Sequence, residues 1–107
     1  MTDHDNAGPV RSTFSDDPEM LELVEMFVED MPERLGQIER CWSEGLTEEL
    51  GRVAHQLKGA SAGYGFASLG EAARELEQRI KLDPEVQLEE LRNEYESLID
   101  ICSRVTL

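Results

Sequence analysis

The sequence has few positively charged residues and no long apolar run. Its 107 residues include 10 lysines and arginines against 24 aspartates and glutamates, so the formal net charge is −14. Nucleic acids and anionic membrane surfaces would repel such a chain, and we expect it to bind neither. No stretch approaches the ~20 apolar residues that cross a bilayer. The opening residues MTDHDN lack the basic start and apolar run of a signal peptide, which predicts a cytoplasmic protein.

Cysteine is also scarce. The chain has two, Cys41 and Cys102, and both are in register with apolar neighbours. Two cysteines at this spacing make neither a disulfide framework nor a metal site. We therefore expect two small, buried thiols of a protein that resides in a reducing compartment, and no metal ion or cofactor bound by this chain.

No segment alternates apolar and polar residues with the period of a strand, whereas apolar residues at intervals of three and four recur along the chain. They predict four amphipathic helices joined by short turns. The fold class expected is all-α, an antiparallel four-helix bundle over residues 16–107. A polar segment broken by Gly8-Pro9 precedes it, and we expect a flexible N-terminal tail over residues 1–15.

Several local signals mark the helix ends. Pro18 suits the first turn of the first helix, which Pro32 should kink or break near its middle and Gly45 should end. Thr47 is the expected N-cap of the second helix. Four aromatic residues are expected in the core rather than against a cofactor: Phe27, Trp42, Phe66 and Tyr95.

The second predicted helix carries a histidine where a bundle core does not need one. At 100° per residue its apolar stripe contains Leu46, Leu50, Val53, Leu57, Ala60 and Tyr64. His55 projects about 180° away from the centre of that stripe. Small residues surround it on the outer face, namely Gly51, Gly59 and Ala62. This arrangement predicts an imidazole exposed on a rigid helix, with a clear approach for a protein partner.

Three roles are open to such a histidine: metal ligand, general base and covalent nucleophile. A metal site needs a second ligand one turn away, where this helix has Gly51, Lys58 and Gly59. A general base needs an orienting carboxylate and a group to activate. Neither lies within one turn, although another helix could supply them. A nucleophile needs only a neutral ring, an open face and a charge that offsets the incoming group.

The neighbours of His55 match the needs of a nucleophile. A histidine in water is largely uncharged at neutral pH. Lys58 lies one turn further on and can bring an ammonium near the ring, where it would offset the nearly two negative charges of a phosphoryl group. Gly59 costs the helix about 1 kcal/mol relative to alanine. Close helix packing would explain this glycine, but it faces away from the apolar stripe, which favours steric access for a partner.

The string His55-Gln56-Leu57-Lys58-Gly59, followed by Gly65-Phe66, resembles the signature of histidine-containing phosphotransfer (HPt) domains. The resemblance extends from about Pro9 to the C-terminus and includes Asp16-Asp17-Pro18 and the segment FVEDMP at residues 27–32. It implies that His55 accepts the phosphoryl group, that Lys58 is the charge partner of that group and that Gly59 leaves room beside it. We assign the surrounding docking surface to Gly51, Gln56, Gly59 and Ala62.

The resemblance further implies a relay between response-regulator receiver domains. A receiver phosphoaspartate would pass its phosphoryl group to His55, forming a phosphoramidate, and a second receiver would take it away. The expected partners are receiver domains, or a hybrid sensor kinase, and Mg²⁺ is expected in the receiver. The chain has no Gly-rich nucleotide loop and no GxxxxGK[ST] motif, so we expect a monomeric phosphoryl carrier without its own ATP site rather than an enzyme.

Some alternatives stay open at the level of sequence. The chain could stand alone, form the C-terminal module of a hybrid histidine kinase, or be the N-terminal phospho-accepting domain of a chemotaxis-type kinase. From a different functional class, it could be a receiver-binding adaptor or a four-helix scaffold that never carries phosphate. A hydrolytic or metal-dependent enzyme is the third hypothesis.

Overall fold

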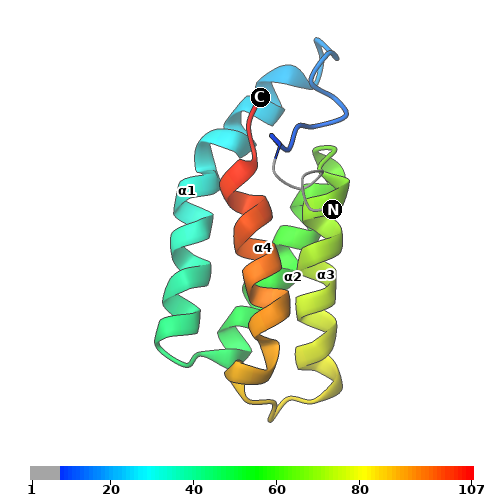
Figure 1. The fold of residues 1–107 in the computed structure, drawn as a ribbon. Coiled ribbons are helices and arrows are strands. Elements are labelled where there is room, and N and C mark those ends of the chain that lie inside the picture. Colours follow the sequence, from blue (N-terminus) through cyan, green and yellow to red (C-terminus); the bar gives the residue numbers. More distant parts are fainter. Residues whose placement is uncertain (1–7) are drawn as a thin grey trace.

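Four helices form a ring in the computed structural model, which describes residues 8–107. The elements are α1 (Leu21–Ser43), α2 (Thr47–Gly63), α3 (Ala67–Leu82), the 3₁₀ turn η2 (Leu88–Leu91) and α4 (Arg92–Arg104). Each α-helix contacts its two neighbours in the order α1, α2, α3, α4 and back to α1. Successive helices alternate in direction (Figure 1). The predicted all-α four-helix bundle is confirmed.

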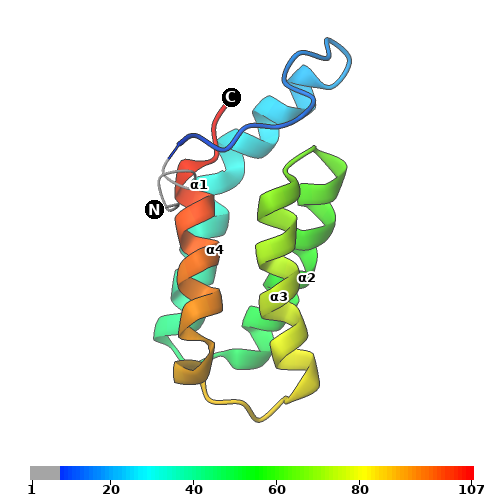
Figure 2. The same ribbon diagram turned by 45° about the vertical axis from the view of Figure 1, so that its right-hand side comes forward.

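The first helix differs from the prediction at its start. Residues 13–16 and 18–20 lie in turns, and α1 begins at Leu21, whose backbone N–H donates to the carbonyl of Asp17 at 2.9 Å. The expected start at Pro18 is therefore three residues too early. The helix is not broken at Pro32, although its first turns lean away from the bundle axis (Figure 2). It ends at Ser43, and Gly45 turns the chain with a φ of +72°.

The second helix begins at Thr47, but Leu46 occupies the N-cap position and no side chain caps the helix. The prediction of Thr47 as the N-cap is therefore wrong. Two glutamates in the first turn, Glu48 and Glu49, place negative charge at the positive end of the helix dipole. They stabilise this end electrostatically where no capping hydrogen bond does so.

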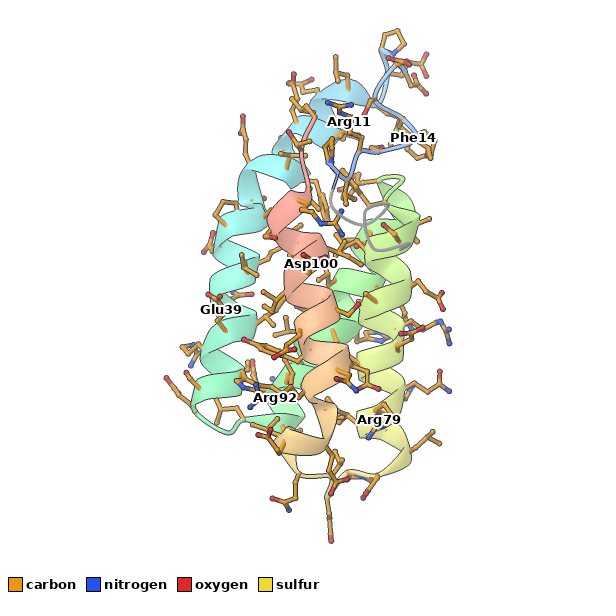
Figure 3. The ribbon with its side chains drawn as sticks, viewed as in Figure 1. Arg11, Phe14, Glu39, Arg79, Arg92 and Asp100 are labelled. Atoms are coloured by element: carbon orange, nitrogen blue, oxygen red, sulfur yellow. The ribbon has the colours of Figure 1, made fainter. Side chains whose placement is uncertain are left out.

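The core lies inside the ring of helices and contains most of the apolar residues predicted for it. The rings of Phe27 and Phe66 are buried and stack with their centroids 5.1 Å apart. Trp42 and Tyr95 also stack on each other, at 4.0 Å, but they are only partly buried at the margin of the core. The thiols of Cys41 and Cys102 are buried and unpaired, as expected. Charged side chains such as Glu39 on α1 lie on the outside (Figure 3).

The expected flexible tail is wrong for residues 8–15, and residues 1–7 lie outside the described part of the chain. Val10 pairs with the segment after α4: its N–H donates to the Arg104 carbonyl at 2.8 Å, and its carbonyl accepts from Thr106 at 3.0 Å. Ser12 is buried and donates through its hydroxyl to the Tyr64 carbonyl at 2.5 Å. These contacts satisfy backbone polar groups that water would otherwise solvate, so the segment is part of the fold.

The turn between α2 and α3 requires glycine. Gly65 has a φ of +84°, and a Cβ at this position would lie 2.6 Å from the Ser12 hydroxyl. The ring of Phe14, labelled in Figure 3, would be 2.9 Å from the same Cβ. The left-handed backbone and the close approach of the N-terminal segment both exclude a larger residue.

Helices α2 and α3 pack closely because small residues line their interface. A Cβ on Gly51 would lie 3.2 Å from Cγ2 of Ile80, and one on Gly70 would lie 3.5 Å from Cβ of Ser61. The buried face of α2 is accordingly shifted toward α3 and contains Leu50, Ala54, Leu57 and Ser61. At 100° per residue this face is rotated by about 50° from the predicted stripe. His55 is therefore about 130° from its centre, on the flank of α2 beside α3.

Candidate functional site

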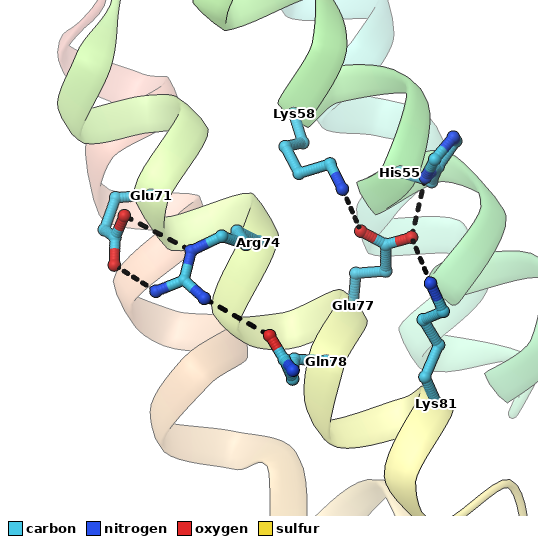
Figure 4. A network of polar contacts seen from close by, with 7 residues as sticks. All are labelled: His55, Lys58, Glu71, Arg74, Glu77, Gln78 and Lys81. Atoms are coloured by element: carbon cyan, nitrogen blue, oxygen red, sulfur yellow. Dashed lines mark hydrogen bonds and ion pairs between the residues drawn. The ribbon is translucent and has the colours of Figure 1, made fainter.

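His55 is exposed, as the helical projection predicts, but it is not isolated. Its side chain is 62 % exposed, and its Nδ1 atom lies 2.6 Å from Oε2 of Glu77 on α3. The other ring nitrogen points away from that carboxylate (Figure 4). The edge of the imidazole that contains Nδ1 is thus held by the neighbouring helix, while the edge that contains Nε2 remains open to a partner.

Glu77 is a nearly buried carboxylate on the flank of α3, with only 8 % of its side chain exposed. Its Oε1 atom accepts from the ammonium of Lys58 at 3.0 Å. The ammonium of Lys81, one turn further along α3, lies 3.9 Å from Oε2. Glutamates are rarely buried unless they are paired. Here the carboxylate has an imidazole and two ammonium groups around it (Figure 4).

The surroundings of Glu77 decide the protonation of the site. Burial by itself would raise the pKa of this carboxyl, but hydrogen bonds from Lys58 and His55 outweigh burial, and the net pKa is lowered. The carboxylate is therefore ionised at neutral pH and can only accept hydrogen bonds. It follows that Nδ1 of His55 carries a proton. In the neutral ring the lone pair is then on Nε2, the exposed nitrogen.

Lys58 lies within the same group of residues and contacts a carboxylate that the sequence alone does not identify. Its side chain is 36 % exposed and its ammonium is bound to Glu77 rather than directed only to solvent. Lys58 thus bridges α2 to α3 and holds the carboxylate that in turn holds His55. It remains beside the ring, where it can also meet an incoming anion.

The two glycines that flank His55 along α2 have different surroundings. A Cβ on Gly59 would meet nothing within 4 Å, so this residue faces open space beside the histidine. A Cβ on Gly51 would press on Ile80. Gly51 therefore packs in the α2–α3 interface, and its assignment to the docking surface stays a prediction.

Gln56 and Ala62 lie on opposite sides of the exposed face of α2. Gln56 lines a polar groove of about 290 Å³ between α1 and α2, together with Asp30, Glu33, Arg34 and Gln37. Ala62 lines a mainly apolar hollow of about 440 Å³ between the N-terminal segment, α2 and α3. Lys58 and Phe14 border the same hollow. The surface around His55 therefore has a polar side and an apolar side.

Glu77 and Lys81 were missed by reasoning from the sequence. The signal for Glu77 is its spacing on α3, four residues after the buried Ala73 and three before the buried Ile80. A carboxylate in register with a core stripe needs a partner of opposite charge. The sequence does not say which helix supplies that partner, because the answer depends on how closely α2 and α3 approach.

Two further properties concern residues 8–107 as a group. No three His, Cys, Asp or Glu side chains in this part of the chain converge to form a candidate metal site. None of the helices within it combines the length and the apolar character that a bilayer crossing requires.

Comparison with known proteins identifies a family to which the chain is similar. The family model described as the Hpt domain matches residues 22–101, in agreement with the resemblance seen in the sequence. No curated protein and no solved structure matches the chain. The matched range covers α1 to α3 and most of α4, and it contains both His55 and Glu77.

Proposed function

The chain belongs to the Hpt domain family and is a phosphotransfer module of phosphorelays; on that premise we propose that His55 accepts the phosphoryl group. Domains of this family interact with the receiver domains of response regulators, and they are phosphoryl carriers rather than enzymes with an ATP site. We propose a receiver phosphoaspartate as donor and a second receiver as acceptor. We propose that the chain acts as a monomer.

The observation that carries this proposal is the contact between His55 and Glu77. A carboxylate 2.6 Å from Nδ1 fixes both the tautomer and the orientation of the ring. The nucleophilic lone pair is then on Nε2, which is the nitrogen a partner can reach. Carboxylates orient catalytic histidines in the same way in nucleophile–base–carboxylate triads.

The transfer step follows from this geometry. Nε2 attacks the phosphorus in line with the leaving carboxylate oxygen of the receiver aspartate. The O–P bond breaks, an N–P bond forms, and the aspartate leaves as a carboxylate. The ring, protonated on Nδ1 and phosphorylated on Nε2, becomes positively charged, and the ionised Glu77 stabilises that charge. The receiver, rather than this chain, would hold the Mg²⁺ that stabilises the phosphoryl oxygens.

The same contact also supports the return step. As long as Nδ1 keeps its proton, the imidazole is a good leaving group, and a second receiver aspartate can take the phosphoryl group. Gly59 leaves space beside the ring for the receiver loops that must approach closely. The site is therefore suited to passing a phosphoryl group on rather than to storing it.

Label transfer from phosphorylated receiver domains tests the proposal. We expect wild-type protein to gain an acid-labile, alkali-stable label, as a phosphoramidate does, and His55→Gln to gain none. The variant should keep the fold, because Lys58 still pairs with Glu77 and a glutamine amide can donate to the same carboxylate. His4→Gln, which removes the other histidine, is the control and should retain full labelling. A label on His55→Gln would refute the assignment, and binding without any labelling would indicate an adaptor.

A further inference from the structure

The chain contains two lysines, Lys58 and Lys81, and both contact the same carboxylate. They come from different helices, α2 and α3, and they approach different oxygens of Glu77 (Figure 4). The other eight cationic residues of the chain are arginines. The convergence of both lysines on the carboxylate that anchors His55 needs an explanation in terms of the site.

The two lysines are held very differently. Lys58 lies 3.0 Å from Oε1 with its side chain 36 % exposed, so it makes a true hydrogen bond and is constrained by packing. Lys81 lies 3.9 Å from Oε2, beyond hydrogen-bond distance, and its side chain is 72 % exposed. The ammonium of Lys81 is therefore free to move while it stays beside the oxygen that binds the histidine.

The charges of the group show what each lysine contributes. Glu77 and Lys58 neutralise each other, and the ring of His55 adds no charge in the form that attacks, since only an uncharged imidazole has a free lone pair. The positive charge of Lys81 is then in excess at this point of a chain whose net charge is −14. A phosphoryl group on Nε2 would bring nearly two negative charges to the same place. Without Lys81, the single positive charge that the ring gains on phosphorylation would be the only charge beyond the Glu77–Lys58 pair to offset them.

We propose that Lys81 is a second cation of the phosphoryl site, with a role distinct from that of Lys58. Lys58 holds Glu77 in position, and Lys81 moves from the carboxylate toward the phosphoryl oxygens as the N–P bond forms at His55. This inference rests on the proposed function, since it concerns the same acceptor. It adds a second residue of α3, beside Glu77, to the site.

The choice of lysine over arginine fits this division of roles. Lysine is a compact charge on a flexible stem, and it can exchange one anionic partner for another. The arginines beside the site are instead held by carboxylates on their own helices, as in the pairs Arg52–Glu49 and Arg74–Glu71. A guanidinium locked on a carboxylate in this way is less able to follow a transferred group.

The competing explanation is that Lys81 only stabilises α3. Glu77 and Lys81 are four residues apart with the glutamate first, the favourable order for a helical ion pair worth roughly 0.3–0.5 kcal/mol. Such a role would change the melting temperature slightly but would leave the chemistry of His55 unchanged. The two explanations are therefore separated by a kinetic measurement.

The experiment uses phosphoramidate as the donor, so that no receiver domain contributes charge. Its P–N bond breaks, its nitrogen leaves as ammonia with a proton from solvent, and a new P–N bond forms at Nε2 of His55. The rates of phosphorylation and of hydrolysis are followed by ³¹P NMR for wild type, Lys81→Gln and Lys81→Arg. Arg40→Gln is the charge-matched control, because Arg40 on α1 makes one exposed ion pair, with Glu44.

We expect Lys81→Gln to be phosphorylated about two- to fivefold more slowly than Arg40→Gln at low salt. The difference should shrink at about 1 M salt, where charges are screened beyond about 3 Å, and Lys81→Arg should restore most of the rate. Equal rates for Lys81→Gln and Arg40→Gln at low salt would overturn the inference and leave the proposed function intact. Wild-type protein that gains no phosphoryl group on His55, judged against His55→Gln, would overturn both.

Discussion

Oε2 of Glu77 lies 2.6 Å from Nδ1 of His55, and this contact joins two helices through residues 22 positions apart in the chain. It exists because α2 and α3 approach closely where Gly51 meets Ile80. The ring is exposed enough to meet a partner and is nevertheless fixed in orientation. A structural feature of the α2–α3 interface thus sets which nitrogen of the histidine is available for chemistry.

Glu77→Gln should slow phosphoryl acceptance by about tenfold or more, since the uncharged amide no longer stabilises the charged ring or specifies its tautomer. Loss of the orienting charge in a triad costs as much as about 10⁴-fold, and the receiver supplies part of the stabilisation here. The measurement is the rate of label transfer from a phosphorylated receiver. Glu75→Gln, an exposed position on the same helix, is the control. Equal rates for the two variants would contradict the role of Glu77.

The sequence was sufficient to predict the helices and the exposure of His55, because both depend on local periodicity. It was insufficient for Glu77, because the contact depends on how α2 is rotated against α3. Apolar residues such as Val53 and Ala60 place the predicted buried stripe on one side of the helix. The small residues Gly51 and Ser61 allow α3 to approach from the other side and shift the buried face.

The N-terminal segment was misjudged for a related reason. Polar composition and Gly8-Pro9 are typical of a flexible tail. The hydrogen bonds of Val10 and Ser12 are made to residues at the far end of the chain and in the α2–α3 turn. Partners so distant in sequence leave no local signal. Gly65-Phe66 belongs to a sequence motif, but only the structure, with Ser12 beside Gly65, explains the need for glycine.

The pH dependence of stability should report the ionisation of Glu77. The pKa of Glu77 is lowered in the folded protein. The stability that the ionised carboxylate contributes is therefore fully present above the pKa of about 4.3 in the unfolded chain, and it is lost as the pH falls through the pKa of the folded protein. Between about pH 5 and pH 3, the free energy of unfolding should therefore fall more steeply for wild type than for Glu77→Gln. Urea unfolding across this range is the measurement. Parallel curves for the two proteins would show that Glu77 is not stabilised by its partners.

Gly59 and Gly51 form a matched pair on one helix. Gly59→Ala should raise stability by up to about 1 kcal/mol, because its Cβ meets open space and alanine favours the helix. Gly51→Ala should gain less or lose stability, because its Cβ would lie 3.2 Å from Ile80. Thermal melts compare the two variants. Equal gains in stability would mean that Ile80 does not restrict the space beside Gly51.

Gly59→Gln should separate stability from function. The longer side chain keeps the helical gain of several tenths of a kcal/mol but fills the space beside His55. Transfer from a receiver should slow by roughly tenfold or more, since misplacement by ~1 Å can cost about 10²-fold. Unchanged transfer rates, with a raised melting temperature, would remove Gly59 from the docking surface.

Gly65→Ala should destabilise the protein more than Gly45→Ala does. Both glycines have positive φ, which costs a residue with a Cβ about 1–2 kcal/mol. A Cβ on Gly45 meets nothing, whereas one on Gly65 would meet Ser12, Thr13 and Phe14. The excess loss for Gly65→Ala measures how firmly the N-terminal segment is packed. Equal losses in urea unfolding would indicate that this segment contributes little.

The position of the phosphoryl group on the ring tests the central claim most directly. Protein with ¹⁵N-labelled histidine is phosphorylated by a receiver domain, and the coupling between phosphorus and nitrogen identifies the acceptor atom. The contact of Nδ1 with Glu77 predicts a single phosphorylated species, on Nε2 of His55. A phosphoryl group on Nδ1 of His55, or on any other residue, would contradict the account.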